Sequence, residues 1–299
     1  MASTHGRTLQ HVDAPDPVRP PGAAQPAPAR APNKRRRNNA ALPGDGETWT
    51  ISAATLVVLF ALWWCATHFG WIKPLFLPSP AATLDAFVSA VKGDTQGNTP
   101  LAEHVEVSVI RVLVAFVLAV VTAVPLGIAM GTSRLVRGIA DPLIEFYRPL
   151  PPLAYLPLIV IWLGIDESAK ITLIFLACFA PLAMSAKAGV RSVAIEQINA
   201  ARSLGATRWQ LLRLVVLPAA LPEILTGMRI AIGFGWTTLV AAEMVAATAG
   251  LGQMVLNASN FLRTDIVIMG IVVIGVLAYC FDLLMRRVEA ALTPWKGRM

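Results

Sequence analysis

Long apolar segments alternate with short polar connections along most of the chain. Apolar runs of about 20 residues, the length that crosses the hydrocarbon core of a bilayer, predict membrane-spanning helices. The predicted spans cover residues 51–72, 107–130, 150–165, 170–190, 219–245 and 266–286. The chain is therefore expected to fold as an all-α, polytopic membrane helix bundle of about six transmembrane helices.

The third predicted span is irregular because it is rich in proline. Pro149, Pro151, Pro152 and Pro157 lack a backbone donor and disfavour helix in the residue before each of them, so regular helix is expected to begin only late. Irregular backbone at membrane depth is tolerated where it is buried in protein or lines a watery cavity. Pro151 and Pro152 are therefore candidates for a translocation path. The alternative is a cytoplasmic loop stiffened by proline, with Arg148 at the headgroups.

Two predicted spans carry a small residue at every fourth position. Such faces let helices approach closely in lipid, where apolar packing alone gives little driving force. We expect them to pack on other helices of the protein or across a dimer. The two ladders are Ala115, Ala119, Ala123, Gly127 and Gly131, and Gly227, Ala231 and Gly235.

A polar segment with helical periodicity, residues 196–218, lies between two of the apolar segments. Gly205 can adopt the left-handed conformation that ends a helix. Thr207, followed three residues later by Gln210, is a capping box that starts another. The segment is expected to form two short helices joined by a bend, an arrangement that presents side chains and helix ends to a soluble partner.

Charged residues in or near the predicted spans are further candidates. Arg229 and Glu243 lie in the fifth span, and an ionisable group at mid-bilayer costs about 2.5 to 3.5 kcal/mol on insertion scales, so it should face protein or water. Both are candidates for the translocation path. The alternative for Glu243 is a hydrogen-bonded carboxylate at the end of its helix. Arg111 and Asp282 are expected near the interfaces, where long side chains can reach water.

Composition and charge agree with a membrane protein. Of the 299 residues, 56% are hydrophobic and 14% are charged. With an intracellular N-terminus, nineteen Lys and Arg residues fall on the cytoplasmic side and four on the other, as the positive-inside rule requires. Both termini and the polar segment are therefore expected in the cytoplasm. Because topology accounts for the net charge of +7, that charge is no indication of nucleic-acid binding.

Residues 1–48 are expected to be a disordered, basic cytoplasmic tail rich in proline and alanine, followed by a transmembrane domain over residues 49–299. The basic run at residues 34–37 is expected to help orient the first span, and contact with anionic headgroups is the alternative. The three cysteines are isolated in apolar segments, so neither a metal site nor a disulfide is indicated.

The polar segment resembles the EAA loop of the permease subunits of binding-protein-dependent ABC importers. That pattern is E-A-A, three residues, G, nine residues and I-x-L-P, and the spacing is kept throughout. The matching positions are Asn199, Ala200, Ala201, Gly205, Val215, Leu217 and Pro218. Asn199 replaces the usual Glu, which removes a charge, and Val215 replaces Ile. The resemblance implies that residues 192–218 couple the chain to a cytoplasmic ATPase.

Further stretches resemble the permeases of taurine importers: residues 74–80, 141–165 and 221–248, together with GLGQMV and the closing LTPWKG. This likeness implies the type I ABC importer permease fold and a homodimer in the inner membrane. It also implies two ATPase subunits, which would bind ATP-Mg, and a periplasmic binding protein that delivers taurine. Permeases for other aliphatic sulfonates, nitrate and pyrimidine precursors share the pattern and are the alternative solute classes.

Two functions of other classes are alternatives to a permease subunit. A self-sufficient secondary carrier would show repeat symmetry or paired ionisable residues near mid-membrane, and neither is clear in the sequence. A membrane-embedded enzyme would need a convergent group of acid, base, nucleophile or metal ligands. The chain has no GxxxxGK[ST] phosphate loop, so ATP hydrolysis and its Mg cofactor are expected in a separate subunit, and no catalytic residue is expected here.

Overall fold

The computed structural model describes residues 49–93 and 99–295, and the predicted tail at 1–48 lies outside them. Every regular element of the described residues is a helix, which confirms the all-α prediction. Residues from 54 onward belong to one compact unit, and residues 49–53 form the first turns of α1.

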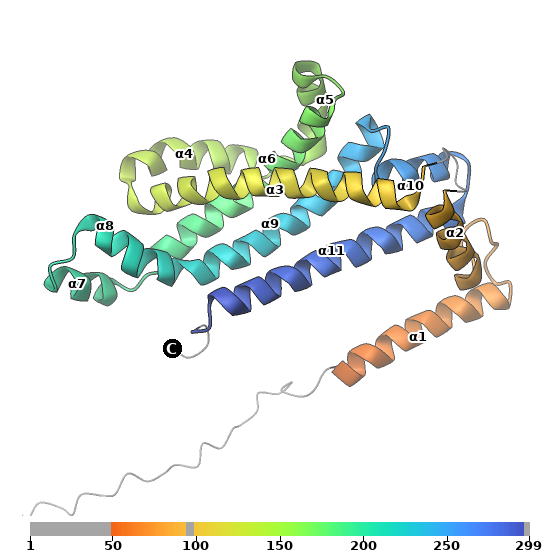
Figure 1. Ribbon diagram of the computed structural model, residues 1–299, viewed down its shortest axis with the longest axis horizontal. Helices are drawn as coiled ribbons and strands as arrows, with labels where there is room; N and C mark the ends of the chain where they lie inside the picture. Colours follow the sequence, from red (N-terminus) through yellow and green to blue (C-terminus); the bar gives the residue numbers. More distant parts are fainter. Residues whose placement is uncertain (1–48, 94–98, 296–299) are drawn as a thin grey trace, which may run out of the picture. The chain divides into compact units, whose positions relative to one another are not determined.

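Twelve helical elements make up the described residues (Figure 1). They are α1 (Trp49–His68), α2 (Pro80–Lys92), α3 (Leu101–Thr132), α4 (Arg134–Tyr147), α5 (Pro152–Leu163), α6 (Glu167–Arg191), α7 (Ile195–Ser203), α8 (Arg208–Leu211), the π-helical turn η1 (Leu212–Val216), α9 (Leu217–Ala246), α10 (Leu251–Asn260) and α11 (Thr264–Leu292).

Among the described residues, five helical runs are long and apolar enough to cross a membrane, and α4 and α5 together form a sixth candidate, bent by 104°. The predicted count of about six is therefore confirmed, with the third span broken. The expectation that regular helix begins late in that span is wrong, because α5 begins at Pro152. Proline is tolerated in the first turn of a helix, where its missing N–H would have no partner in any case.

Helix α4 was not predicted, because its polar residues interrupt the apolar run. Its two buried side chains, Ala140 and Ile144, are four residues apart and therefore share one face, which packs into the main hydrophobic core. The result is a helix that buries one apolar stripe and exposes further large apolar residues, such as Leu135, Ile139 and Phe146.

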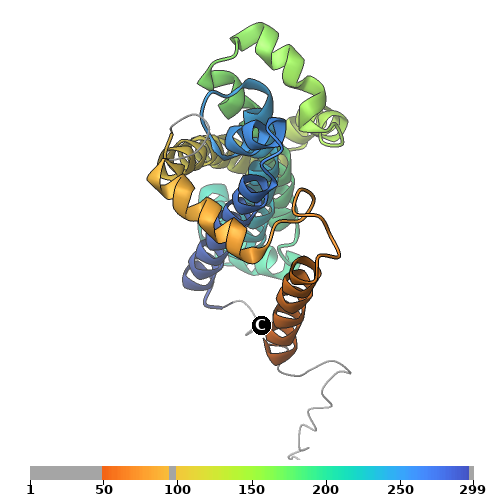
Figure 2. The ribbon, with the colours of Figure 1, turned by 90° about the vertical axis from the view of Figure 1, so that its right-hand side faces the viewer.

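Helix α6 lies at the centre of the bundle, between α3 and α9 (Figures 1 and 2). Both predicted ladders of small residues pack on it. A Cβ at Gly127 of α3 would overlap the Ala183 carbonyl oxygen, and a Cβ at Gly227 of α9 would overlap the Ser185 side chain. The prediction that these faces pack on other helices is therefore confirmed, within one chain.

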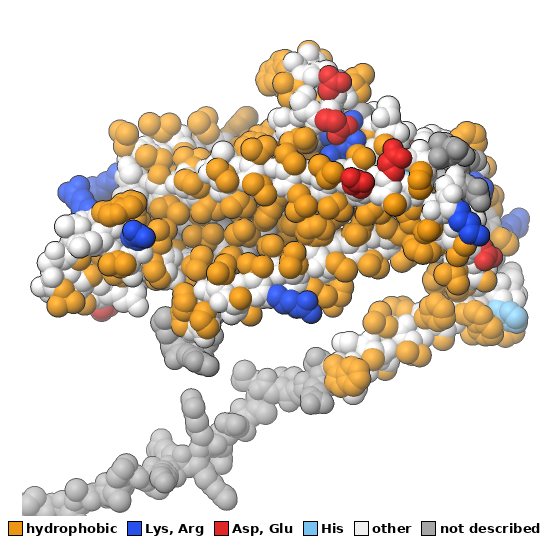
Figure 3. Space-filling view, viewed as in Figure 1, with side chains coloured by type: hydrophobic (Ala, Val, Ile, Leu, Met, Phe, Trp, Pro, Cys, Tyr) orange, Lys and Arg blue, Asp and Glu red, His pale blue; other side chains and the backbone are white. Residues whose placement is uncertain are grey.

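Apolar side chains cover most of the face shown in Figure 3. Many large hydrophobic residues of α1, α3, α5 and α11 are exposed. A soluble domain would bury such residues, whereas a helix in lipid satisfies its backbone internally and can face outward with apolar side chains. The surface therefore agrees with a chain that crosses a membrane several times.

The connections between the long helices lie at two opposite ends of the bundle. Helices α7 and α8 lie at the end where α3 and α6 finish (Figure 1). Helices α2 and α10 lie at the other end, which faces the viewer in Figure 2. The two ends are built differently, and each holds residues of functional interest.

Candidate functional site

The segment from Ile195 to Pro218, here called the coupling segment, forms a helical corner. Helix α7 ends just before Gly205, which has a left-handed φ of 81°. At the start of α8, the Gln210 backbone N–H donates to Thr207 Oγ1 (3.3 Å), and the Thr207 N–H donates to Gln210 Oε1 (2.9 Å). The predicted capping box and the predicted pair of short helices are therefore confirmed.

Large apolar side chains of the coupling segment are exposed rather than packed. Leu204 is 89% exposed and Trp209 is 66% exposed, and Ile195 and Leu214 are also mostly exposed. Among the residues of the EAA pattern, Asn199, Ala200 and Gly205 are exposed, and Val215 and Pro218 line a groove of about 410 Å³. Exposed apolar side chains grouped on a polar segment are typical of a surface that contacts another protein or a membrane.

The coupling segment is joined firmly to the bundle. Val216 of η1 is buried in a hydrophobic cluster with Ala186 and Val190 of α6 and Ala220 and Ile224 of α9. The segment then continues without a break into α9, with Pro218 in the first turn. A force applied to the exposed corner would therefore reach both α6 and α9.

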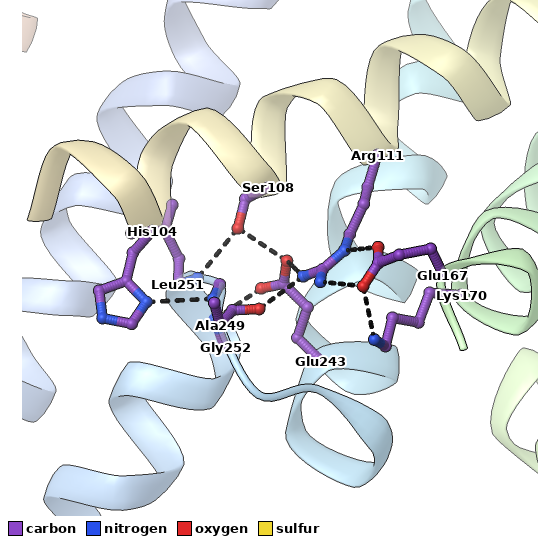
Figure 4. Close-up of polar contacts among 10 residues, drawn as sticks. His104, Ser108, Arg111, Glu167, Lys170, Glu243, Ala249, Leu251 and Gly252 are labelled. Carbon is purple, nitrogen blue, oxygen red and sulfur yellow. Dashed lines mark hydrogen bonds and ion pairs between the residues drawn. The ribbon is translucent and has the colours of Figure 1, made fainter. Parts of the chain in front are cut away.

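At the opposite end of the bundle, a buried cluster of charged residues, here called the ion cluster, joins three helices (Figure 4). Arg111 of α3 donates from Nη1 to Glu243 Oε1 of α9 (2.7 Å), and from Nε and Nη2 to the carboxylate of Glu167 in α6 (2.6 Å each). Lys170 of α6 pairs with Glu167 at 2.8 Å. The side chains of Arg111, Lys170 and Glu243 are 3%, 4% and 0% exposed, whereas that of Glu167 is 55% exposed, so the cluster runs from a buried carboxylate to one at the surface.

Neutral groups also donate hydrogen bonds to both carboxylate oxygens of Glu243. Ser108 Oγ donates to Glu243 Oε1 (2.7 Å) and accepts from the Leu251 N–H (2.9 Å). The Gly252 N–H donates to Glu243 Oε2 (2.8 Å). A buried carboxylate is stable when it is both paired and hydrogen-bonded, and Glu243 meets both conditions.

The turn between α9 and α10 is held by the same cluster. The Gly250 N–H donates to His104 Nδ1 (3.0 Å), and Arg111 Nη1 donates to the Ala249 carbonyl oxygen (2.7 Å). Gly250 has a φ of 134°, and a Cβ there would overlap the Glu243 carboxyl group. Only glycine fits this position. The cluster therefore fixes the starts of α3, α6 and α10 to the end of α9.

One expectation about a charged residue is decided by this geometry, and one stays a prediction. Arg111 pairs with carboxylates on two other helices at one end of the bundle, where Glu167 is 55% exposed, so its place near an interface remains a prediction. The alternative considered for Glu243, a hydrogen-bonded carboxylate near the end of its helix, is confirmed. The spacing of His104, Ser108 and Arg111, which places three polar residues on one face of an apolar helix, is the signal that could have revealed the cluster.

Arg229, the other charged candidate in the fifth span, links α9 to α11. Its guanidinium lies 3.1 Å from Asp282 and 3.3 Å from Glu289. Arg229 pairs with two carboxylates of the chain, and Glu243 pairs with Arg111 and accepts hydrogen bonds from neutral groups. Their role in a translocation path remains a prediction.

A cavity of about 500 Å³ lies at the turn between α4 and α5. Pro151 and Pro152, the proline candidates for a translocation path, line it, whereas Arg229 and Glu243 do not. The other lining residues are Tyr147, Arg148, Pro149, Leu150, Tyr155, Leu176, Ala177, Ala180, Pro181, Met184, Ser185, Ile230 and Phe234. The broken backbone of the third span thus lines a hollow, as irregular backbone at membrane depth is expected to do.

Comparison with known proteins gives consistent matches. Residues 123–294 match the family described as binding-protein-dependent transport system inner membrane component. The chain is 52% identical to the taurine transport system permease protein TauC of Escherichia coli over 250 residues, which cover 84% of this chain and 91% of that one. It is 34% identical to the putative aliphatic sulfonates transport permease protein SsuC of E. coli, over 80% of this chain and 89% of that one.

A more distant relative is named for another solute, and a solved structure has the same fold. The nitrate import permease protein NrtB of Synechocystis is 30% identical over 73% of this chain and 81% of its own length. An inward-facing structure of the MetNI methionine ABC transporter contains a chain that superposes with a TM-score of 0.58 at 22% identity, covering 64% of this chain and 96% of that one. The fold is therefore that of a type I ABC permease.

Proposed function

The chain belongs to the family of binding-protein-dependent transport system inner membrane components, and we propose that the solute it carries is taurine. Its curated relatives are transport permeases, and the chain is a multi-pass membrane protein with the permease role of an ABC transporter. The proposal therefore concerns the solute, the assembly and the way in which movement is coupled to ATP.

The observation that carries the proposed solute is the gap in identity between relatives. The chain shares 52% of its residues with a taurine permease, against 34% with a permease for aliphatic sulfonates and 30% with one for nitrate, over similar shares of its length. Since these relatives share one fold, the extra identity with the taurine permease favours taurine as the solute.

Uptake in cells tests this proposal. A bacterial strain that lacks its own taurine permease, but keeps the matching ATPase and binding protein, would receive the chain or an empty vector. We expect growth on taurine as the sole sulfur source, and uptake of labelled taurine, only with the chain. Uptake of a longer alkanesulfonate or of nitrate without uptake of taurine would contradict the proposal.

The proposed assembly contains two copies of the chain, two cytoplasmic ATPase subunits and a periplasmic binding protein. ATP and Mg would be bound by the ATPase subunits, and no catalytic residue is assigned to this chain. Both termini and the coupling segment would lie on the cytoplasmic side of the inner membrane, an orientation supported by the distribution of Lys and Arg. The family description, which names both an inner membrane and a binding protein, supports this assembly.

Coupling would act through the exposed corner of the coupling segment. Leu204 and Trp209 would dock into the ATPase subunit, and its closure on ATP would displace the corner. Because Val216 packs between α6 and α9, the displacement would move these helices together. The ion cluster would keep the far ends of α3, α6 and α9 in register. Rotation of the whole helix group, rather than bending of one helix, would then switch access to the cavity at the α4–α5 turn.

A further inference from the structure

We propose that the cavity at the α4–α5 turn contains a binding site for the sulfonate group of the transported solute, and that Arg148 contacts this group. The inference rests on the proposed function and names a residue that determines which solutes can pass. Four observations support it: the depth of the cavity, the lack of a partner for Arg148, the hydroxyl groups near it, and the absence of acidic side chains from its lining.

The cavity lies at the middle of two of the helices that form it, α6 and α9. Helix α6, which runs from 167 to 191, contributes six residues between 176 and 185. At 1.5 Å per residue, the first of them is about 13 Å from the outer end of α6. Helix α9 contributes Ile230 and Phe234, which also lie in the middle of their helix. Arg148, which lines the same cavity, is therefore far from either end of the bundle.

Arg148 is exposed and, unlike four cations of α3, α6 and α9, has no carboxylate partner among the described residues. Arg111, Lys170, Lys187 and Arg229 each contact a carboxylate at 3.3 Å or less. Arg148 forms no ion pair or hydrogen bond through its side chain with any residue that the structure describes. A cation at membrane depth faces protein partners or water, so an unpaired Arg148 beside a cavity is placed to receive an anion from the cavity.

The chemistry of the site suits a sulfonate. A guanidinium presents several N–H donors in a planar fork and binds oxyanions through two parallel hydrogen bonds. Ser185 adds a hydroxyl to the lining. The hydroxyl of Tyr147, next to Arg148, is buried and has no hydrogen-bond partner among the described residues. A small movement of the turn that admitted a sulfonate oxygen to this hydroxyl would give it the hydrogen-bond partner that it lacks.

The lining also suits the amine of a zwitterion such as taurine. Among the residues that the structure describes, no acidic side chain lines the cavity, whereas the aromatic rings of Tyr147, Tyr155 and Phe234 do. An ammonium group is attracted to an aromatic face more weakly than to a carboxylate in a dry site. The solute would therefore be held by its sulfonate and released readily, as a transport path requires.

Transport by the complete complex tests the inference. The permease, its ATPase subunits and its binding protein would be reconstituted in liposomes, and taurine moved per ATP hydrolysed would be measured. We expect Arg148→Ala to lower this ratio at least tenfold and Arg148→Lys, which keeps the charge but loses the fork, to lower it less. Arg134→Ala, at the other end of α4 and exposed, is the matched control and should leave the ratio unchanged.

The ratio separates a solute site from a structural role, because a misfolded variant loses ATP hydrolysis and transport together. Unchanged ratios for both Arg148 variants would overturn the inference, as would an equal loss for Arg134→Ala. If the wild-type complex moved no taurine, the proposed function would fail by itself. The same variants would then be compared with ethanesulfonate and nitrate. If the Arg148 variants lose transport of an anion that the wild-type complex carries, the anion site is supported. If Arg148→Ala transports that anion as well as the wild type does, the anion site is overturned.

Discussion

The two ends of the helix bundle are built on opposite principles. In the coupling segment, apolar side chains such as Leu204 and Trp209 are left exposed. In the ion cluster at the other end, charged side chains such as Arg111 and Glu243 are buried. The coupling segment therefore presents apolar side chains that a partner could cover, whereas the ion cluster has its partners within the chain.

This difference indicates that the coupling segment is suited to contact another protein and that the ion cluster is suited to hold helices together. A buried, fully bonded polar network makes its helices rigid and specifies one arrangement. Exposed apolar groups add little to the stability of the chain itself and become useful when another protein covers them. We infer that substitutions at the ion cluster will act mainly on folding, whereas substitutions in the coupling segment will act mainly on assembly and transport.

The largest loss of stability is expected for Arg111→Ala. It removes the partner of the fully buried Glu243, and breaking a buried ion pair in this way destabilises a protein by about 3 to 5 kcal/mol. Thermal unfolding of the purified chain in detergent measures the effect. Arg263→Ala is the control, because its pair with Asp265 is partly exposed and should contribute about 1 kcal/mol or less. Equal shifts for the two variants would contradict the holding role of the cluster.

An intermediate loss is expected between the two ends, at the contact of α3 with α6. Gly127→Leu places a large side chain where even a Cβ would overlap the Ala183 carbonyl oxygen, and overpacking costs about 1 to 3 kcal/mol. The yield of folded chain and its melting temperature should both fall. The matched variant Gly275→Leu, on α11, faces open space and should behave as the wild type. A wild-type melting temperature for Gly127→Leu would contradict the close contact of α3 with α6 at this position.

The smallest change in stability is expected in the coupling segment. Leu204→Ser and Trp209→Ser alter exposed side chains, so the free energy of unfolding should change by about 0.5 kcal/mol or less. Recovery of the ATPase subunits in affinity purification should fall sharply. Leu262→Ser, at the opposite end of the bundle and 69% exposed, is the control and should retain them. Full recovery with both coupling-segment variants would show that docking lies elsewhere.

How far the sequence predicts each region depends on how local its interactions are. The corner at Gly205 and the capping box of Thr207 and Gln210 are set by residues within a few positions of one another, and both were predicted. The helix spans follow from apolar runs of membrane length, which are also local patterns. The ladders of small residues identified packing faces, although the sequence did not show that both meet α6.

The ion cluster could not be predicted in the same way, because its partners are far apart along the chain. Arg111, Glu167 and Glu243 come from three helices, and each alone is an isolated charge near an apolar run. Their pairing depends on the helix register that the fold imposes. Helix α4 was missed for a related reason, because its polar residues interrupt the apolar run and its buried residues pack on a core formed by distant helices.

Substitutions at Gly205 test most directly whether movement of the ATPase subunits enters the chain through the exposed corner. The measurement is taurine moved per ATP hydrolysed by the reconstituted complex with Gly205→Val and with Gly205→Asn. Valine disfavours the left-handed conformation, whereas asparagine tolerates it, and neither meets a neighbouring atom at its Cβ. The account predicts a ratio at least tenfold lower for Gly205→Val and largely retained for Gly205→Asn. A wild-type ratio for Gly205→Val, or taurine transport by the chain without ATPase subunits, would contradict it.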